Sequence, residues 1–426
     1  MNLLLGFNND RLYSICQYAD ILITLKKEIM VKRKKIVLLI LIILAASHTV
    51  FAQKSPVNVY AAIDKKALQI PDSLTKTTEL IANYITANFS TDKDKARAIF
   101  VWVASSIEYD LDNMFALNYY EKKEDKINKA LNTRKGICEN YAFVFTDICN
   151  KAGLKSHVIA GYTKQNGFTD YLPHAWCATL IDTSWFLFDP TWGSGYVSNG
   201  KFYKKINNDY FKGQPAQFIK SHMPFDYLWQ FLHYPITHRE FLDGKTAANQ
   251  NKPYFNFTDT LHAFELLKPL DQLVSTAYRI EKNGVSNSLV FDRLQRITYE
   301  IESEKQNAII NLYNAAVVDY NEAIYALNDF INYRNHQFTP IKPDPEIQKM
   351  LDSPALLLKQ ATHKLGEIAT TDENTMQLIG QLVRSIDDAS KQITEQQDWL
   401  KLYFSKGKLA RRSMFYKVTW YGIPLN

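Results

Sequence analysis

The sequence predicts an α+β domain followed by an all-α region, and three patterns support this prediction. Apolar residues recur at helical spacing from Cys138 to Ala152. Three runs of strand character follow, at residues 156–163, 174–182 and 185–188. We expect the helix to pack on an antiparallel sheet built from these strands. From about residue 257 onward, apolar residues step by three and four positions, which predicts a helical bundle or coiled-coil hairpin.

Length and composition favour a folded protein with more than one domain. The chain has 426 residues, which suits two domains better than one. Its residues are 46% hydrophobic and 13% aromatic, enough for a substantial core, and this composition excludes a wholly disordered protein.

The N-terminal segment has the three parts of a secretory signal. The basic cluster Lys32–Lys35 precedes the apolar run Ile36–Ala46, and small residues allow cleavage after Ala52. We therefore predict a signal peptide over residues 30–52 and export to the periplasm or the cell exterior. The alternative is that this segment remains as an N-terminal membrane anchor. The apolar run is short for a span of roughly 20 residues, and no other integral membrane segment is predicted.

Residues 1–29 precede the predicted signal and are interpreted as an extension from an upstream start codon. Residues 1–52 hold seven Lys or Arg and three Asp or Glu, so their removal lowers the net charge from +6 to about +2. Part of the net positive charge of the chain therefore comes from the predicted targeting segment. No stripe of Arg and Lys with interleaved aromatic residues is present, and we expect no nucleic-acid partner.

The cysteines indicate neither a disulfide framework nor a metal site. The chain has Cys16, Cys138, Cys149 and Cys177, of which three remain after cleavage. An odd number leaves at least one free thiol in an oxidising compartment. No pair has the spacing of metal ligands, so we predict neither a metal nor a cofactor. Cys149 and Cys177 are expected to be small buried apolar residues.

The regions around the sheet are less regular. Residues 53–70 are predicted to be an extended lead-in, residues 73–107 to form two helices, and residues 118–131 to be a surface connection. Residues 193–245 have little periodicity and are expected to wrap around the sheet domain. We place the catalytic domain at residues 53–250 and the helical region at residues 257–426.

Cys138, His174 and Asp189 form the candidate site. The thiol opens a predicted helix, whose N-terminus favours a thiolate, and the other two lie on successive predicted strands. Alone, each has a plainer interpretation: a buried cysteine, a structural histidine and a turn residue. Together they provide a nucleophile, a base within reach and a carboxylate to orient that base. Glu139 would oppose a thiolate beside it, and we expect its side chain to face solvent.

The motifs around these residues resemble the transglutaminase-like superfamily, with its papain-like core. The matching stretches are Gly136–Ala142 (GICENYA), His174–Trp176 (HAW) and Trp185–Trp192 (WFLFDPTW). The aromatic-rich segment after the core, with an H-x-P-x-D element at His222–Asp226, resembles the bacterial branch similar to kyphoscoliosis peptidase. The resemblance covers about residues 75–245. Residues 257–426 resemble no family.

The resemblance implies a cysteine peptidase or acyltransferase with a thioester intermediate. Cys138 would be the nucleophile, His174 the general base and acid, and Asp189 the orienting carboxylate. For the oxyanion, the backbone N–H of Cys138 is the natural donor. The side chain of Trp102 is a weaker candidate, and its plainer interpretation is core packing. We favour hydrolysis of protein or peptide amides over cross-linking, because members outside the animal cross-linking enzymes often resemble peptidases.

Two other functions remain open from the sequence. The domain could be an inactive binding module, with the helical region recruiting a protein partner; the intact set of three residues argues against it. A weaker alternative is an envelope peptidoglycan amidase, which the predicted compartment would allow.

Overall fold

The computed structural model describes residues 24–40, 58–115, 118, 121–165, 168–370, 372–418 and 424–425. The chain divides into two compact units, residues 1–65 and 66–426. In the first, residues 24–40 form an exposed helix. The predicted cleavage site and residues 1–23 of the predicted extension lie outside the described residues. None of the described helices combines the length and apolar character that crossing a bilayer requires.

Two predicted helices precede the site. Helix α3 (Thr78–Asn88) and helix α4 (Asp92–Ser106) each begin after a threonine, Thr77 or Thr91, whose side chain accepts a hydrogen bond from the first turn. Both pack against the helix that carries Cys138. A short helix, α2 (Ala61–Ala67), and a 3-10 turn, η1 (Asp72–Thr75), come before them.

The expected surface connection at residues 118–131 was wrong, because helix α5 (Lys123–Thr133) lies there. Ile127, Ala130 and Leu131 form a buried stripe on one face of this helix. Because this stripe is short and the rest of the segment is charged, the sequence pattern of the segment resembles that of a loop. The extended lead-in expected at residues 53–70 was likewise wrong where α2 forms.

The antiparallel sheet is confirmed and has four strands. The order is β5-β4-β3-β8, and every neighbouring pair is antiparallel. Asp182, with φ of 55°, makes the tight turn between β4 and β5. The strand bounds are β3 (Ser156–Gln165), β4 (Phe168–Ile181), β5 (Ser184–Phe188) and β8 (His222–Pro224).

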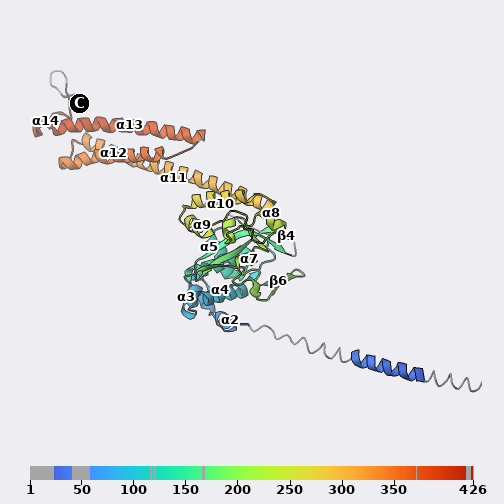
Figure 1. The fold of residues 1–426 in the computed structure, drawn as a ribbon. Coiled ribbons are helices and arrows are strands. Elements are labelled where there is room, and N and C mark those ends of the chain that lie inside the picture. Colours follow the sequence, from blue (N-terminus) through green and yellow to red (C-terminus); the bar gives the residue numbers. More distant parts are fainter. Residues whose placement is uncertain are drawn as a thin grey trace, which may run out of the picture. The chain divides into compact units, whose positions relative to one another are not determined.

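Helix α6 (Cys138–Lys151) covers one face of this sheet. The thiol of Cys177 on β4 contacts the carbonyl oxygen of Ala142 on α6 at 3.5 Å. The neighbouring strand residues Trp176 and Ala178 belong to a core cluster on the other face. In Figure 1, α3 and α4 lie on one side of the sheet, with α9 and α10 on the other.

Two small strand pairs complete the domain. Strands β1 (Glu108–Tyr109) and β2 (Lys135–Gly136) pair in parallel. Strands β6 (Gly195–Ser198) and β7 (Lys201–Lys204) form a hairpin. The other short elements between β5 and the helical region are η2 (Asn208–Tyr210), α7 (Pro215–Phe218), η3 (Tyr227–Gln230) and α8 (His238–Leu242).

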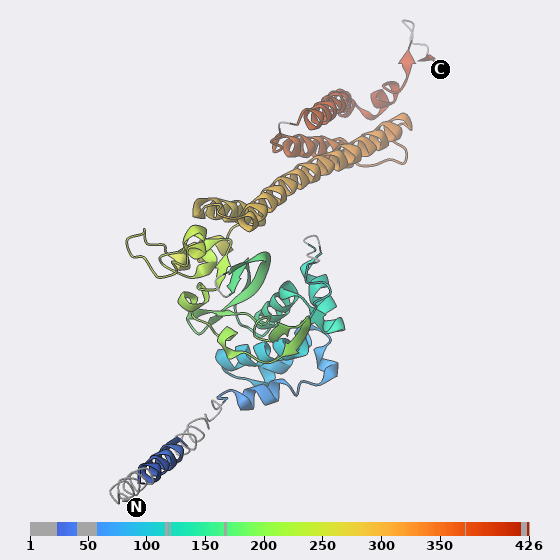
Figure 2. The same cartoon turned by 90° about the vertical axis from the view of Figure 1, so that its right-hand side faces the viewer.

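The helical region begins on the sheet domain and continues as a hairpin of long helices (Figure 2). The elements are α9 (Phe257–Glu265), α10 (Pro269–Asn283), α11 (Ser288–Asn335), α12 (Asp344–Gly366), α13 (Glu373–Phe404), α14 (Lys408–Ser413), β9 (Lys417–Val418) and β10 (Pro424–Leu425). Ile280, Val290 and Ile297 share one core cluster with Tyr162 of β3. The apolar core therefore continues across the expected boundary near residue 250.

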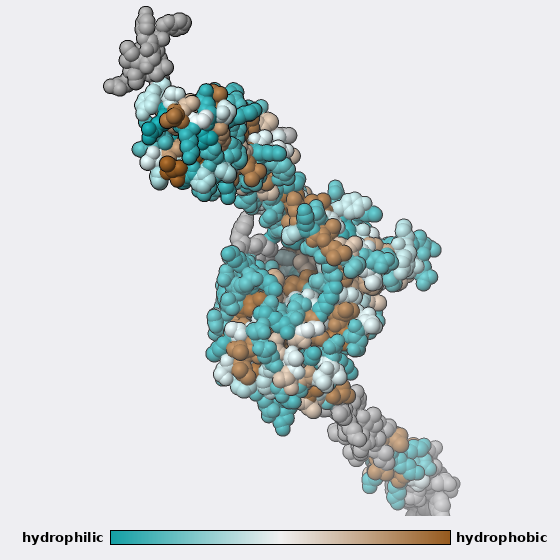
Figure 3. Space-filling model, turned by 90° about the vertical axis from the view of Figure 1, so that its left-hand side faces the viewer, coloured by the Kyte–Doolittle hydropathy of each residue, from teal (hydrophilic) through white to brown (hydrophobic). Residues whose placement is uncertain are grey.

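The distal part of the region has its own core. The apolar stripes of α11, α12 and α13 meet there, with Phe338 surrounded by aromatic rings. Lys364 near the end of α12 pairs with Asp319 in α11 at 2.6 Å, so the two helices run antiparallel. On the face in Figure 3, exposed apolar side chains are scattered among polar ones.

A buried ion pair fastens α10 to the sheet domain. The guanidinium of Arg279 donates two parallel hydrogen bonds to Asp226, at 2.8 and 2.7 Å. The two side chains are only 5% and 3% exposed. Asp226 also caps η3 by accepting from the N–H of Leu228 at 3.0 Å. The pair therefore joins the segment after β8 to the first long helices.

We predict that Arg279→Met lowers the free energy of unfolding by about 3–5 kcal/mol, because it leaves the buried carboxylate of Asp226 without its cation. Urea unfolding of the chain from residue 53 measures this. Lys391 and Asp388 form an exposed pair, 74% exposed each, so Lys391→Met is the matched control and should leave the midpoint unchanged. Equal midpoints for the two variants would contradict the assigned role of the buried pair.

Candidate active site

Cys138 is held at the first residue of α6 by its local sequence. The N–H of Ile137 donates to the side-chain oxygen of Asn140 at 2.9 Å, and the amide nitrogen of Asn140 donates to the carbonyl of Lys126 at 3.0 Å. A side chain at Gly136 would place its Cβ 2.6 Å from the Cβ of Asn140, so this position requires glycine. The thiol, 6% exposed, thus begins the helix at a fixed position.

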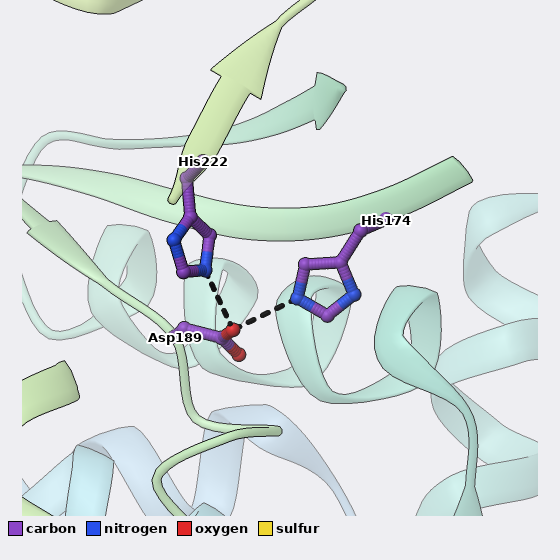
Figure 4. A group of neighbouring side chains, drawn as sticks. All are labelled: His174, Asp189 and His222. Atoms are coloured by element: carbon purple, nitrogen blue, oxygen red, sulfur yellow. Dashed lines mark hydrogen bonds and ion pairs between the residues drawn. The ribbon is translucent and has the colours of Figure 1, made fainter. Parts of the chain in front are cut away.

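His174 and Asp189 are brought together by the pairing of their strands. Cys177 of β4 pairs with Phe188 of β5, so Asp189 follows directly after the paired strand and His174 lies three residues before Cys177. The Nε2 of His174 donates to Oδ2 of Asp189 at 2.8 Å (Figure 4). The predicted approach of the imidazole and the carboxylate is therefore present in the structure.

Asp189 is fully buried, and four N–H groups donate to its carboxylate. Oδ1 accepts from the backbone N–H groups of Thr191 at 2.9 Å and Trp192 at 3.1 Å. Oδ2 accepts from Nε2 of His174 at 2.8 Å and from Nε2 of His222 at 3.1 Å. These donors replace the water that an ionised carboxylate loses on burial.

His222 is the member of this group that the sequence reasoning missed. It lies on β8, the edge strand, and its ring is held between Trp192 and Phe218, with centroids 4.7 and 4.6 Å away. Its Nδ1 lies 2.8 Å from the hydroxyl of Ser221. Since Nε2 donates to Asp189, Nδ1 accepts from that hydroxyl in the neutral ring. His222 opens the H-x-P-x-D element, but that element was interpreted only as part of a segment that wraps around the sheet domain.

The electrostatics separate the two histidines. Burial alone lowers the pKa of His174, but the charge and hydrogen bond of Asp189, with a hydrogen bond from the ring to Cys138, raise it to about 10. Burial likewise lowers the pKa of His222, and Asp189 compensates only in part. Burial raises the pKa of Asp189, but the two histidines hold it well below its ordinary range. His174 is therefore the protonated ring and His222 the neutral one.

The thiol lies on the other side of His174. Cys138 and His174 line one cavity, and Cys138 helps to raise the pKa of the imidazole. Because Nε2 is used by Asp189, Nδ1 is the nitrogen left for the thiol. The structure thus brings all three predicted residues together, in the order thiol, imidazole and carboxylate. Cys149 and Cys177 are fully buried, and burial raises the pKa of both thiols.

Trp102 lies away from this group. It is 3% exposed, with the guanidinium of Arg134 5.4 Å from its ring centroid, and it does not line the two cavities that contain His174. This placement matches the core-packing interpretation. The role of Trp102 in binding an oxyanion stays a prediction, and the position of its side chain does not support it.

Tyr109 is a second residue that the sequence reasoning did not single out for the site. It pairs with Gly136 through β1 and β2, which places it two residues from Cys138 across a strand bridge. Burial, with the charges of Cys138 and Asp189, raises its pKa to about 12, so its phenol keeps its proton at neutral pH. Short two-residue strands leave no periodicity, so sequence pattern could not find this contact.

Glu139 does not face solvent freely, contrary to expectation. Its carboxylate pairs with the ammonium of Lys126, and the two side chains are 22% and 9% exposed. The ion pair offsets the negative charge beside the thiol, which is how an acid is accommodated at that position.

One group of side chains has the geometry for a metal among the residues that the structure describes. The possible ligand atoms of His174, Asp189 and His222 lie within 4.8 Å of one another. A bound ion would have to displace the N–H protons that both rings donate to the carboxylate. The two rings and the carboxylate therefore fit a hydrogen-bonded group better than a set of metal ligands.

Comparison with known proteins identifies the superfamily of this core. Residues 79–190 match the model of the transglutaminase-like superfamily. This part of the chain belongs to that superfamily. Its fold is an α+β transglutaminase-like core followed by a helical region.

The curated relatives cover the same core. Mouse kyphoscoliosis peptidase (Mus musculus) is 32% identical over 193 residues, 43% of this chain and 28% of the relative. Hillarin of Drosophila melanogaster is 27% identical over 199 residues, 42% of this chain and 24% of the relative. The chain thus spans about a quarter of their length. The solved periplasmic domain of TgpA from Pseudomonas aeruginosa is 20% identical, with a TM-score of 0.23, over 31% of this chain and 49% of that one.

We predict that His174 is doubly protonated and His222 neutral at pH 8, as nitrogen NMR of labelled imidazoles would show. The raised pKa of His174 means that its contribution to stability is complete below about pH 6.5 and is lost as the pH rises through about 10. The lowered pKa of Asp189 means that its contribution is complete above about pH 3.8 and is lost in stronger acid.

Asp189→Asn should move the midpoint of His174 down toward its ordinary value, since Cys138 alone then opposes the effect of burial. Ser221→Ala is the control, because it removes a contact of His222 and leaves the bond between His174 and Asp189 in place. A neutral His174 at pH 8 in the unsubstituted protein would contradict the charge assignment.

Proposed function

We propose that this protein is an exported thiol hydrolase that cleaves protein or peptide amides through Cys138, His174 and Asp189. The observation that carries the proposal is the hydrogen bond from Nε2 of His174 to the buried Asp189, with Cys138 lining the same cavity as His174. This arrangement orients the imidazole and keeps it charged beside a thiol at a helix N-terminus.

The proposed reaction has two halves. The sulfur of Cys138 attacks the amide carbonyl carbon, and His174 gives its proton to the leaving nitrogen as the C–N bond breaks. The product is a thioester and a free amine. His174 then removes a proton from water, whose oxygen attacks the thioester carbon. The C–S bond breaks, a carboxylic acid leaves, and the thiolate and imidazolium are restored.

Hydrolysis is preferred to cross-linking here because curated relatives include proteins named as peptidases. An amine in place of the water would give transfer by the same steps. Export rests on the predicted signal over residues 30–52. The alternative of an inactive binding module has no support from the site, where His174 is bonded to Asp189 and lines one cavity with Cys138.

We predict that iodoacetamide modifies Cys138 faster than Cys149 or Cys177, as peptide mass spectrometry would measure. Cys138 is 6% exposed and lines a cavity with His174, whereas the other thiols are fully buried and protonated. His174→Ala should slow the labelling of Cys138 at least tenfold at pH 7, because the positive charge that favours a reactive sulfur is then absent. Cys149→Ala is the matched control and should change nothing.

The same protein, from residue 53, is then assayed on casein-derived peptides, a glutamine-amide with an amine acceptor, and peptidoglycan. Turnover that is lost in Cys138→Ala supports the proposal, and the substrate that turns over separates peptidase, cross-linking and wall amidase. Equal labelling rates for the three cysteines, or turnover retained in Cys138→Ala, would overturn the catalytic assignment.

We further predict that Tyr109→Phe lowers kcat about 10- to 100-fold with little change in KM. Tyr109 pairs with Gly136, two residues before Cys138, and its phenol keeps its proton, so we propose it as a donor to the oxyanion of the transition state. Trp102→Phe, a substitution in the core behind the site, should leave kcat within a few fold. A larger loss of kcat in Trp102→Phe than in Tyr109→Phe would favour Trp102 as the donor.

A further inference from the structure

Two cavities meet at His174, and they differ in what else they contain. The first, of about 130 Å³, is lined by Cys138 and His174 together with the first turns of α11. The second, of about 620 Å³, is lined by His174 but not by Cys138. The imidazole thus separates a small space that holds the thiol from a larger one that does not.

The chemistry of acyl transfer assigns different halves of a substrate to these spaces. The acyl carbon is bonded to the sulfur in the intermediate, so the acyl half must occupy the cavity that contains Cys138. The leaving amine needs contact only with the imidazole, which gives it a proton. The larger cavity therefore suits the leaving half of the substrate. This step rests on the proposed function.

Five aromatic residues from separate elements line the larger cavity, together with polar side chains. Tyr109, Trp192 and Tyr210 are three of them, and the β6–β7 hairpin contributes Tyr196 and Phe202. Tyr196 is 54% exposed, and its ring stacks on Tyr203, with centroids 5.5 Å apart. An aromatic side chain left half in water on a short hairpin has apolar area to bury against a ligand.

The charges of this cavity disfavour a cationic occupant. No carboxylate lines it among the described residues, whereas Lys164 and the protonated His174 both do. The ammonium of Lys164 is held by the carbonyl oxygens of Phe241 and Leu242, at 3.3 and 3.1 Å. A lysine side chain would meet two positive charges, so a neutral ring is the better fit.

We propose that the cavity between the β6–β7 hairpin and His174 is a subsite for an aromatic side chain on the leaving-group side of the scissile amide. Tyr196 and Phe202 recognise the ring, and Trp192 forms the wall next to the imidazole. The volume of about 620 Å³ is within the range of small-ligand pockets, so the leaving half extends beyond the amine nitrogen.

Binding tests the subsite without any turnover. Cys138→Ala protein from residue 53 is titrated with N-acetyl-phenylalaninamide, N-acetyl-alaninamide and N-acetyl-lysinamide, followed by ligand NMR. We expect the phenylalanine compound to bind about tenfold more tightly than the other two, from the apolar area that its ring buries. Tyr196→Ala should remove this preference. Tyr325→Ala, an exposed tyrosine on α11, is the matched control and should keep it.

Kinetics then test whether the subsite acts on the leaving group. In peptides that differ only in the residue after the scissile bond, kcat/KM should be about tenfold higher for phenylalanine than for alanine or lysine. Tyr196→Ala should lower that ratio to near one. Equal binding of the three compounds, or preference for lysine, would overturn the subsite whatever the fate of the triad. Selective binding without Cys138-dependent turnover would instead keep the subsite and reject the proposed function.

Discussion

The buried carboxylate of Asp189 is the constraint on which the rest of the site depends. Burial of an ionised carboxylate costs several kcal/mol unless donors replace its water. Here four N–H groups do so, from a turn after β5, from His174 on β4 and from His222 on β8. Removing any one donor would leave part of that cost uncompensated. The geometry of His174 is therefore fixed by the whole sheet.

The need for a donor from β8 also explains the long segment between β5 and the helical region. The chain leaves the sheet after Asp189, forms the β6–β7 hairpin, and returns to add His222 at the sheet edge. That excursion builds the aromatic cavity beside His174. The element that stabilises the buried carboxylate of Asp189 and the element proposed to select the leaving group are thus one stretch of chain.

Sequence pattern could predict the parts of this site that lie on long, regular elements. The apolar stripe after Cys138 and the alternation around His174 identified the helix and the strands, which the structure confirms. His222 lies on a strand of three residues and Tyr109 on one of two, too short for any periodicity. Their contacts join residues far apart in the chain, and only the sheet order reveals them. Helix α5 was missed because its buried stripe has three residues.

The shared core changes how the helical region should be tested. Ile280, Val290 and Ile297 pack with Tyr162 of β3, and Arg279 neutralises the buried Asp226. A chain cut at residue 257 would expose that apolar surface and leave the carboxylate of Asp226 without its cation. Loss of function after such a deletion would then report unfolding of the sheet domain and say nothing about a partner. Substitution of exposed residues on α12 and α13, whose core is separate, leaves the catalytic core intact. Such substitutions therefore test whether the helical region binds a partner, separately from its effect on stability.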